Sequence, residues 1–168
     1  MSDYRRVRAP GGTYFFTVNL AGRHGTLLID HIDLLRKALA TVRERQPFGI
    51  DAWVVLPDHL HAIWHLPGDD QDYSGRWREI KKGFTKGLAR STAVWQPRFW
   101  EHTIRDEKDY RTHMDYVHIN PVKHGLVPRV ADWPYSTFHR LVQAGVYPAD
   151  WAGGAPGDID AGEAPPVP

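Results

Sequence analysis

Cysteine is absent from the 168-residue chain, methionine occurs only twice, and no long hydrophobic run is present. The absence of cysteine excludes disulfide bonds, zinc–thiolate sites and thiol catalysis, so a metal ion would have to be held by His, carboxylate or amide side chains. No apolar segment approaches the roughly 20 residues that span a bilayer, and the N-terminal residues form no signal-peptide core. We therefore expect a soluble, cytoplasmic protein without a membrane partner.

The composition, with 42% hydrophobic and 12% aromatic residues, is sufficient for one hydrophobic core. We predict a single domain over residues 1–152, followed over residues 153–168 by a flexible, acidic Gly/Pro-rich tail that adds nothing to the core. The net charge is only +1, but residues 76–129 carry 12 basic and 6 acidic side chains. This local excess favours a polyanionic partner, although a solvated helix face would give much the same count.

Hydrophobic patterning predicts four strands and three helices, in the order strand, helix, strand, strand, helix, strand, helix. The strands are expected over residues 13–20, 50–56, 59–66 and 99–104, and the helices over residues 30–46, 77–88 and 106–120, the last ended by Pro121. The first six elements have the split βαβ order of a ferredoxin-like α+β sandwich. We predict an antiparallel sheet with helices on one face, the other face free for ligands, and an added C-terminal catalytic helix.

The predicted third strand has one apolar and one His-rich face. His59 and His61 alternate with Leu60 and Ala62, so both imidazoles project from the same face, with Cα atoms about 7 Å apart. This spacing is workable for two ligands of one ion. Taken alone the signal is weak, because a chain with ten histidines often contains such a pair by chance, as two polar residues on a solvated sheet face.

The predicted last helix carries a tyrosine and an amide on one side. Tyr116 and Asn120 are four residues apart, so they lie one above the other, about a third of a turn from the apolar stripe of Tyr110, Met114 and Val117. Tyr116 is therefore not an obvious core residue. The simpler interpretation is a tyrosine at the rim of the core, with its ring packed and its hydroxyl in water.

A catalytic interpretation combines this tyrosine with the His pair. A phenol with a pKa near ~10 is a poor nucleophile at neutral pH unless its proton is removed or its target is polarised. A divalent cation, Mg²⁺ or Mn²⁺, on His59, His61 and the Asn120 amide oxygen would polarise a scissile phosphate and stabilise the leaving oxygen. Attack by Tyr116 would give a phosphotyrosine, which a DNA hydroxyl can reverse without a nucleotide cofactor.

Several ordered motifs resemble one family. His59-Leu60-His61 resembles the His-hydrophobic-His motif of the HUH endonuclease superfamily. The stretches Trp95–His102, Tyr116–Leu126 and Asp132–Phe138 resemble the REP-associated tyrosine transposases, relatives of single-tyrosine insertion-sequence transposases. The similarity runs from about Tyr4 to Trp151.

This resemblance implies a metal-dependent single-strand DNA endonuclease and strand transferase. It implies metal on His59 and His61, and Tyr116 as the nucleophile that becomes linked to the 5′ phosphate at the cut. Asn120 stands where transposing relatives often have Gln as third ligand. The implied substrates are single-stranded repetitive extragenic palindrome (REP) hairpins with a 5′ guide tetranucleotide, bound by a monomer. In some relatives a C-terminal tail covers the active site, and residues 153–168 would be able to do the same.

Basic side chains are the candidates for DNA contact. On base rates, such residues are more often a solvated helix face, but a DNA substrate favours contact with phosphates. The candidates are Arg5, Arg6, Arg8, Arg78, Lys82, Lys86 and Lys123.

Two other classes of function remain open at the level of sequence. One is a non-catalytic module that binds single-stranded nucleic acid on the open sheet face, for which the chain has no aromatic-rich RNA-recognition motif. The other is a metal-binding or metal-sensing protein, which would bind its ion tightly without DNA. Either would lack a covalent DNA adduct on Tyr116 and would show no chelator-sensitive nicking.

Overall fold

The chain folds around one four-stranded antiparallel sheet. The computed structural model describes residues 12–23, 25–90, 92–153, 159 and 161–163. The strands lie in the order β2-β3-β1-β4, and each pair of neighbours is antiparallel. This order, with β1 and β3 in the centre, is the split βαβ arrangement, so the ferredoxin-like prediction is confirmed. The strands are β1 (Thr13–Asn19), β2 (Gly49–Val55), β3 (His59–His65) and β4 (Trp100–Thr103).

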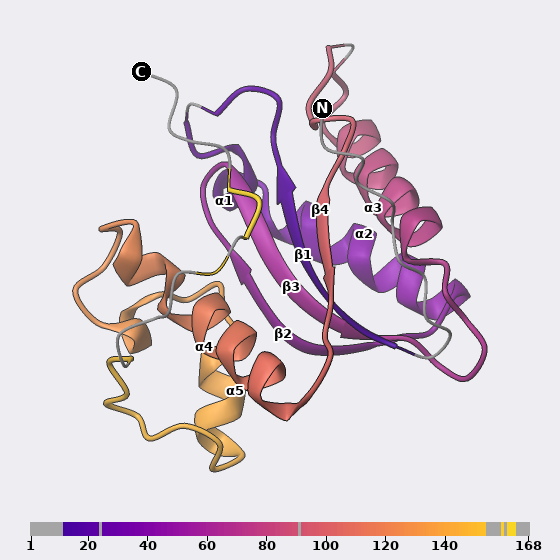
Figure 1. Cartoon of the computed structure of the whole chain (residues 1–168). Coiled ribbons are helices and arrows are strands. Elements are labelled where there is room, and N and C mark those ends of the chain that lie inside the picture. Colours follow the sequence, from indigo (N-terminus) through magenta and orange to yellow (C-terminus); the bar gives the residue numbers. More distant parts are fainter. Residues whose placement is uncertain (1–11, 24, 91, 154–158, 160, 164–168) are drawn as a thin grey trace.

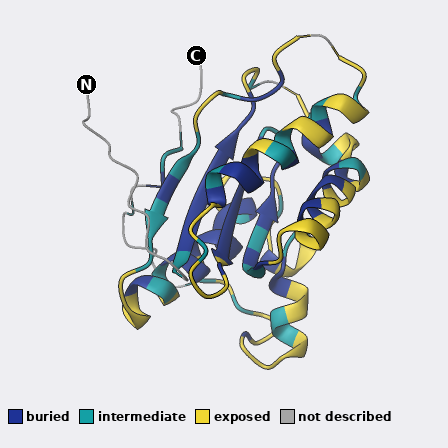
Figure 2. Ribbon diagram, turned by 90° about the vertical axis from the view of Figure 1, so that its right-hand side faces the viewer, coloured by how far each residue is buried: buried dark blue, intermediate teal, exposed yellow. Residues whose placement is uncertain are grey.

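Two long helices cover one face of this sheet (Figure 1). They are α2 (Ile32–Arg45), which follows the short helix α1 (Leu27–Asp30), and α3 (Tyr73–Gly87). Their apolar stripes pack with the apolar side chains of β1 and β3 in the larger core cluster. In Figure 2 the central strands β1 and β3 are almost entirely buried, the edge strands are partly so, and the exposed sides of the helices point away from the sheet.

The opposite face carries the later part of the chain. Helix α4 (Glu107–Lys123) lies over β2 and β3, and it is followed by η1 (Val130–Asp132) and α5 (Phe138–Gln143). The prediction that this sheet face is free for ligands is therefore wrong for the part under α4. The reason is that this face of the sheet is also apolar: Phe15 and Ile63 are fully buried against Met114 and Val117 of α4.

Helix α4 begins as predicted and ends later than predicted. Asp106 is the N-cap, and its side chain accepts a hydrogen bond from the Asp109 amide at 2.8 Å. Pro121 does not end the helix, which continues to Lys123. Only one helical donor is lost at Pro121, and the following turn is held by a 2.9 Å bond from the His124 amide to the Asn120 carbonyl. Asn120 therefore lies inside a regular turn.

Within the described residues, no helix is both long enough and apolar enough to cross a membrane.

The two short elements η1 and α5 were not predicted from the sequence, because their few residues give too short a periodic pattern to recognise.

Candidate active site

The two imidazoles of β3 lie side by side beneath α4. Strand alternation places Leu60 and Ala62 in the core under α2 and α3, and it turns His59 and His61 to the opposite face. Their ring centroids are 5.0 Å apart, and the side chains are only 3% and 0% exposed. Burial lowers the pKa of His61 to about 4. A neutral imidazole, the form that binds metal ions, is thereby favoured.

Tyr116 lies directly against this pair. Its ring centroid is 5.3 Å from that of His61 and 6.0 Å from that of Phe15, edge-on to both. The residue is only 5% exposed, so the interpretation as a rim tyrosine with its hydroxyl in water is wrong. The side of α4 that carries Tyr116 faces the sheet, together with the predicted apolar stripe. Burial and the neighbouring carboxylate of Glu163 raise the pKa of the phenol above its ordinary value.

Asn120 supplies a buried amide one turn further along α4. It is fully buried, and its Nδ2 donates to the Tyr116 carbonyl at 3.1 Å. Its Oδ1 and the Nε2 of His59 are both buried acceptors without a hydrogen-bond partner among the described residues. Each unmet acceptor costs about 1–3 kcal/mol. Both atoms belong to predicted metal ligands, and a bound cation would satisfy both of them.

The C-terminal segment contributes a carboxylate that the sequence did not identify. Glu163 Oε1 is 3.0 Å from His61 Nε2 and 4.0 Å from His59 Nε2, and it accepts a hydrogen bond from the Tyr116 hydroxyl. With the two histidines it forms a group able to hold a metal ion. Burial raises the pKa of this carboxyl, but hydrogen bonds from His124, His61 and Tyr116 outweigh it and hold the pKa below its usual range.

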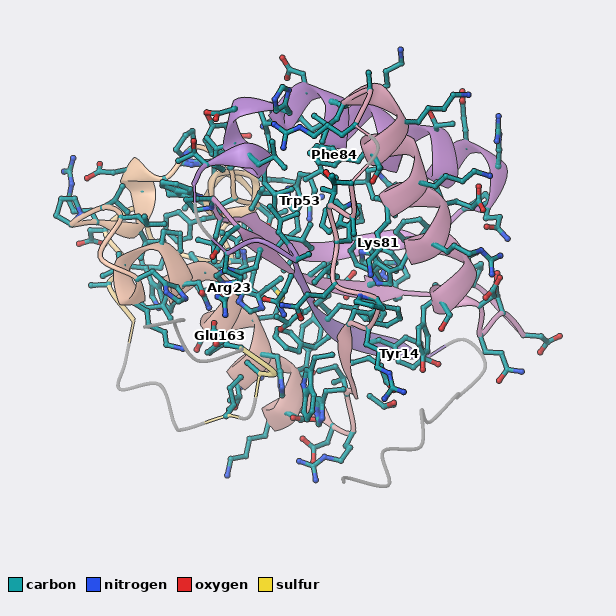
Figure 3. All side chains as sticks on the ribbon, turned by 90° about the horizontal axis from the view of Figure 1, so that it is seen from above. Tyr14, Arg23, Trp53, Lys81, Phe84 and Glu163 are labelled. Carbon is teal, nitrogen blue, oxygen red and sulfur yellow. The ribbon has the colours of Figure 1, made fainter. Side chains whose placement is uncertain are left out.

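Neighbouring residues of the same segment are also packed. Ala161 is 4% exposed, belongs to the core cluster under α4, and accepts a hydrogen bond from the Thr17 hydroxyl through its carbonyl. The expectation that the tail adds nothing to the core is therefore wrong at Ala161. In Figure 3, where the molecule is seen from above, Glu163 lies on the same side as Arg23 and away from Lys81 of α3.

Lys123, predicted as a DNA contact, lies at the phenol itself. Its Nζ donates to the Tyr116 hydroxyl at 3.0 Å and lies 4.6 Å from the centroid of the ring. The same ammonium group donates to Glu163 Oε2 at 3.1 Å. The described site thus brings the buried imidazoles of β3, amide and phenol together with the partly buried carboxylate of Glu163 and the exposed ammonium group of Lys123.

The other predicted DNA contacts lie elsewhere. Arg78 is highly exposed and close to Glu79, while Lys82 and Lys86 form an exposed ridge on α3, on the face of the sheet away from Tyr116. The two lysines line grooves on both sides of this ridge, with volumes of about 680 Å³ and 650 Å³. The structure therefore does not bring this ridge together with the phenol. Arg5, Arg6 and Arg8 lie outside the described residues.

A second group of possible metal ligands has a structural role instead. His102, Asp109 and His113 lie close together, but His102 Nε2, His113 Nδ1 and Asp109 Oδ2 already bond to protein groups. Asp109 Oδ2 accepts from His102 Nε2 at 2.8 Å and from the Arg105 amide at 2.9 Å, and His113 Nδ1 donates to the Asp109 carbonyl at 2.8 Å. This network ties the start of α4 to β4. None of its atoms is among the fully buried side-chain atoms that lack a partner in the described residues, as His59 Nε2 and Asn120 Oδ1 do.

The chain is similar in sequence to proteins of one family. No model of a protein family matched the chain. The chain is 58% identical to a REP-associated tyrosine transposase of Escherichia coli (strain K12), over 97% of this chain and 98% of the relative. It is also 45% identical to a putative REP-associated tyrosine transposase of Haemophilus influenzae, over 91% of this chain and 94% of the relative.

A solved structure extends the comparison to the whole fold. A REP-associated tyrosine transposase bound to a REP hairpin superimposes with a TM-score of 0.95 at 56% identity, covering 99% of this chain and 100% of that one. Identity at this level over nearly the full length of both chains shows that they share a family as well as a fold. The chain belongs to the REP-associated tyrosine transposases and is a DNA-cleaving enzyme of the tyrosine transposase class.

Proposed function

We propose that the enzyme is a metal-dependent single-strand endonuclease and strand transferase that acts on REP hairpins through a 5′-phosphotyrosine on Tyr116. The observation that carries the proposal is the packing of Tyr116 against the paired imidazoles, with ring centroids 5.3 Å apart for Tyr116 and His61. The hairpin substrate is supported by the similar structure, in which a transposase is bound to a REP hairpin.

The residues of the site fit a divalent cation. His59 and His61 through Nε2, and Asn120 through Oδ1, would hold the ion, since His59 Nε2 and Asn120 Oδ1 are buried without a partner among the described residues. Imidazole with amide oxygen suits Mn²⁺ or Mg²⁺. When bound, such an ion polarises the scissile phosphate and stabilises negative charge on the leaving oxygen.

The chain's own groups supply the nucleophile and its positioning. The Tyr116 oxygen attacks phosphorus and the bond from phosphorus to the 3′ oxygen breaks. The phenolic proton passes to water, and the departing 3′ oxygen takes up a proton from water to become a hydroxyl. The phosphotyrosine keeps the 5′ phosphate activated, so a DNA 3′ hydroxyl can reverse the step. Lys123, which donates to the phenol oxygen at 3.0 Å, holds this oxygen and offsets the charge of the phosphate.

The bound C-terminal segment opposes this reaction. The Glu163 carboxylate hydrogen-bonds to the Tyr116 hydroxyl and lies 3.0 Å from His61 Nε2, so it excludes a phosphate from the space between them. A substrate phosphate has to displace this carboxylate. Residues 161–163 therefore act as a competitive cover of the site.

Basic residues outside the site would hold the rest of the DNA. The ridge of Lys82 and Lys86, with Arg78 beside it, lies on the face away from Tyr116 and provides charge for a strand that wraps around the sheet. Arg5, Arg6 and Arg8 remain candidates for the hairpin or its guide tetranucleotide. The enzyme is proposed to act as a monomer.

A single assay tests the proposal. Purified protein is incubated with a labelled REP strand and Mn²⁺, and wild type is compared with Tyr116→Phe on a denaturing gel. Cleavage together with a covalent protein–DNA adduct is expected for wild type only. If the wild-type protein binds DNA but neither cleaves it nor forms an adduct, it is a non-catalytic nucleic-acid-binding module and the proposal is wrong.

A further inference from the structure

We infer that Asp58, tethered by Arg23, is a positioning residue that fixes the ring and the tautomer of His59 so that Nε2 is presented to the cation. The inference rests on the metal site of the proposed function. Neither Asp58 nor Arg23 has a role in the reaction described above.

The contact between Asp58 and His59 determines where the imidazole hydrogen lies. His59 Nδ1 is 2.7 Å from Asp58 Oδ1. A carboxylate oxygen only accepts, so Nδ1 carries the hydrogen and donates it. His59 Nε2 is then an unprotonated acceptor, and it is the atom that is buried without a partner in the described part of the chain. A hydrogen on Nε2 would have no acceptor within hydrogen-bond distance, because the nearest carboxylate oxygen, on Glu163, is 4.0 Å away.

Arg23 and the backbone hold the carboxylate in turn. Arg23 Nε donates to Asp58 Oδ2 at 3.3 Å, and the two side chains are only 10% and 20% exposed. The Asp58 carbonyl accepts from the Leu20 amide at 3.0 Å, which fixes the β2–β3 turn to the end of β1. Asp58 Oδ1 is therefore held in place to accept from His59 Nδ1.

A carboxylate in this position does two things for a metal ligand. It locks the ring orientation and tautomer, and its charge increases the basicity of the coordinating nitrogen. Loss of such an outer partner commonly reduces metal affinity by roughly 10- to 100-fold. Asp58→Asn keeps the size of the side chain, removes the charge, and lets the amide donate to Nδ1 as well as accept from it. The tautomer is then no longer fixed.

The sheet contains a matched pair that serves as a control. Asp51 Oδ1 is 2.5 Å from His65 Nδ1, at the opposite end of β3. The His65 side chain is 56% exposed, however, and Asp51 also accepts from the Tyr110 hydroxyl at 3.0 Å. Asp51→Asn therefore removes an equivalent carboxylate–imidazole contact without touching the candidate metal site.

The experiment measures Mn²⁺ binding and His59 protonation on the full chain. Mn²⁺ affinity is determined by calorimetry for wild type, Asp58→Asn, Arg23→Gln and Asp51→Asn. Imidazole nitrogen NMR reports the tautomer of His59 in the absence of metal. We expect roughly 10- to 100-fold weaker binding for Asp58→Asn, a smaller loss for Arg23→Gln, and none for Asp51→Asn. His59 should carry hydrogen on Nδ1 in wild type and exchange between tautomers in Asp58→Asn.

The outcomes separate this inference from the proposed function. If wild type binds no Mn²⁺, the metal site of the proposed function fails, and the NMR measurement still decides whether Asp58 fixes the tautomer. Wild-type Mn²⁺ affinity in both Asp58→Asn and Arg23→Gln would overturn the inference, as would hydrogen on Nε2 of His59 in the wild-type protein. Should Asp58→Asn fail to fold, Arg23→Gln, which keeps the carboxylate, decides the question.

Discussion

The Glu163 carboxylate accepts a hydrogen bond from the hydroxyl of Tyr116, although 47 residues separate them in the chain. It is also within hydrogen-bond distance of His61 Nε2, at 3.0 Å. This carboxylate binds both the proposed nucleophile and a proposed metal ligand. It resembles a substrate phosphate in its charge and in its oxygen acceptors. The resting enzyme is therefore expected to be limited by release of its own C-terminal segment.

Glu163→Ala should raise the rate of REP-strand cleavage several-fold at subsaturating DNA, because a phosphate then enters without displacing a carboxylate. Ala161 stays in the core in this variant, so the effect is separated from a loss of packing. Asp150→Ala, which removes an exposed acidic residue before the segment, is the control for net charge. Equal or slower cleavage by Glu163→Ala in single-turnover assays would rule out the covering role. Deletion of residues 153–168 should also accelerate cleavage.

Lys123→Ala should lower the rate constant of cleavage by roughly 10- to 100-fold, because the cation that contacts the Tyr116 oxygen at 3.0 Å is lost. Substrate affinity should change less than the rate, since one phosphate contact among many is affected. Lys123→Arg should restore part of the rate. Lys108→Ala, at an exposed position of the same helix, should leave it unchanged. A Lys123→Ala defect confined to affinity would show that this lysine only binds DNA.

The fold could be predicted because its elements are long and regularly patterned. Strand alternation in β3 placed Leu60 and Ala62 in one core and His59 and His61 on the opposite face, as observed. The course of α4 through Pro121 could not be read from sequence, since a proline in the last turn removes only one bond and tertiary packing decides whether the helix continues.

The site was only partly visible in the sequence. His59, His61 and Tyr116 belong to elements whose periodicity is clear, and their clustering follows from packing α4 on the sheet. Glu163 lies in a Gly/Pro-rich segment without periodicity, so no pattern ties it to residues more than 40 positions earlier. Asp58 follows Pro57 in the short turn between β2 and β3, where the sequence indicates only a turn. Its contact with His59 depends on a side-chain rotamer that turn chemistry does not specify.

Loss of the lysine ridge should change the salt dependence of DNA binding. A double variant of Lys82→Ala and Lys86→Ala removes two charges from the ridge on α3. If both contact phosphates, the slope of log affinity against log salt should become shallower by about 0.7 for each contact with single-stranded DNA. Fluorescence anisotropy with a labelled REP strand at several salt concentrations measures this. An unchanged slope would assign both lysines to a solvated helix face.

Metal binding should stabilise the folded chain. An ion that binds only the folded state adds about 2.7 kcal/mol to the free energy of unfolding at a concentration 100 times its Kd. Mn²⁺ should therefore raise the melting temperature of wild type and not that of His61→Ala, and a chelator should abolish both the increase and cleavage. His65→Ala, which removes an exposed histidine from the same strand, should behave like wild type. Equal Mn²⁺-induced shifts in His61→Ala and wild type would locate the ion elsewhere.

Stability should fall in mild acid because buried neutral histidines must take up protons. His118 is fully buried, its Nδ1 donates to the Met114 carbonyl at 2.7 Å, and burial lowers its pKa to about 4. The unfolded chain, in which the pKa is near ~6.5, binds the proton first as the pH falls, so stability is lost between about pH 6.5 and 4. A pKa difference of this size corresponds to on the order of 3 kcal/mol.

Urea unfolding at pH 7.5 and pH 5 measures the change in the free energy of unfolding. This change should be smaller for His118→Gln than for wild type, because only part of the proton uptake remains, at groups such as His61. His139→Gln, at an exposed position, should keep the wild-type pH dependence, and an identical slope in His118→Gln would show that this residue does not titrate on unfolding.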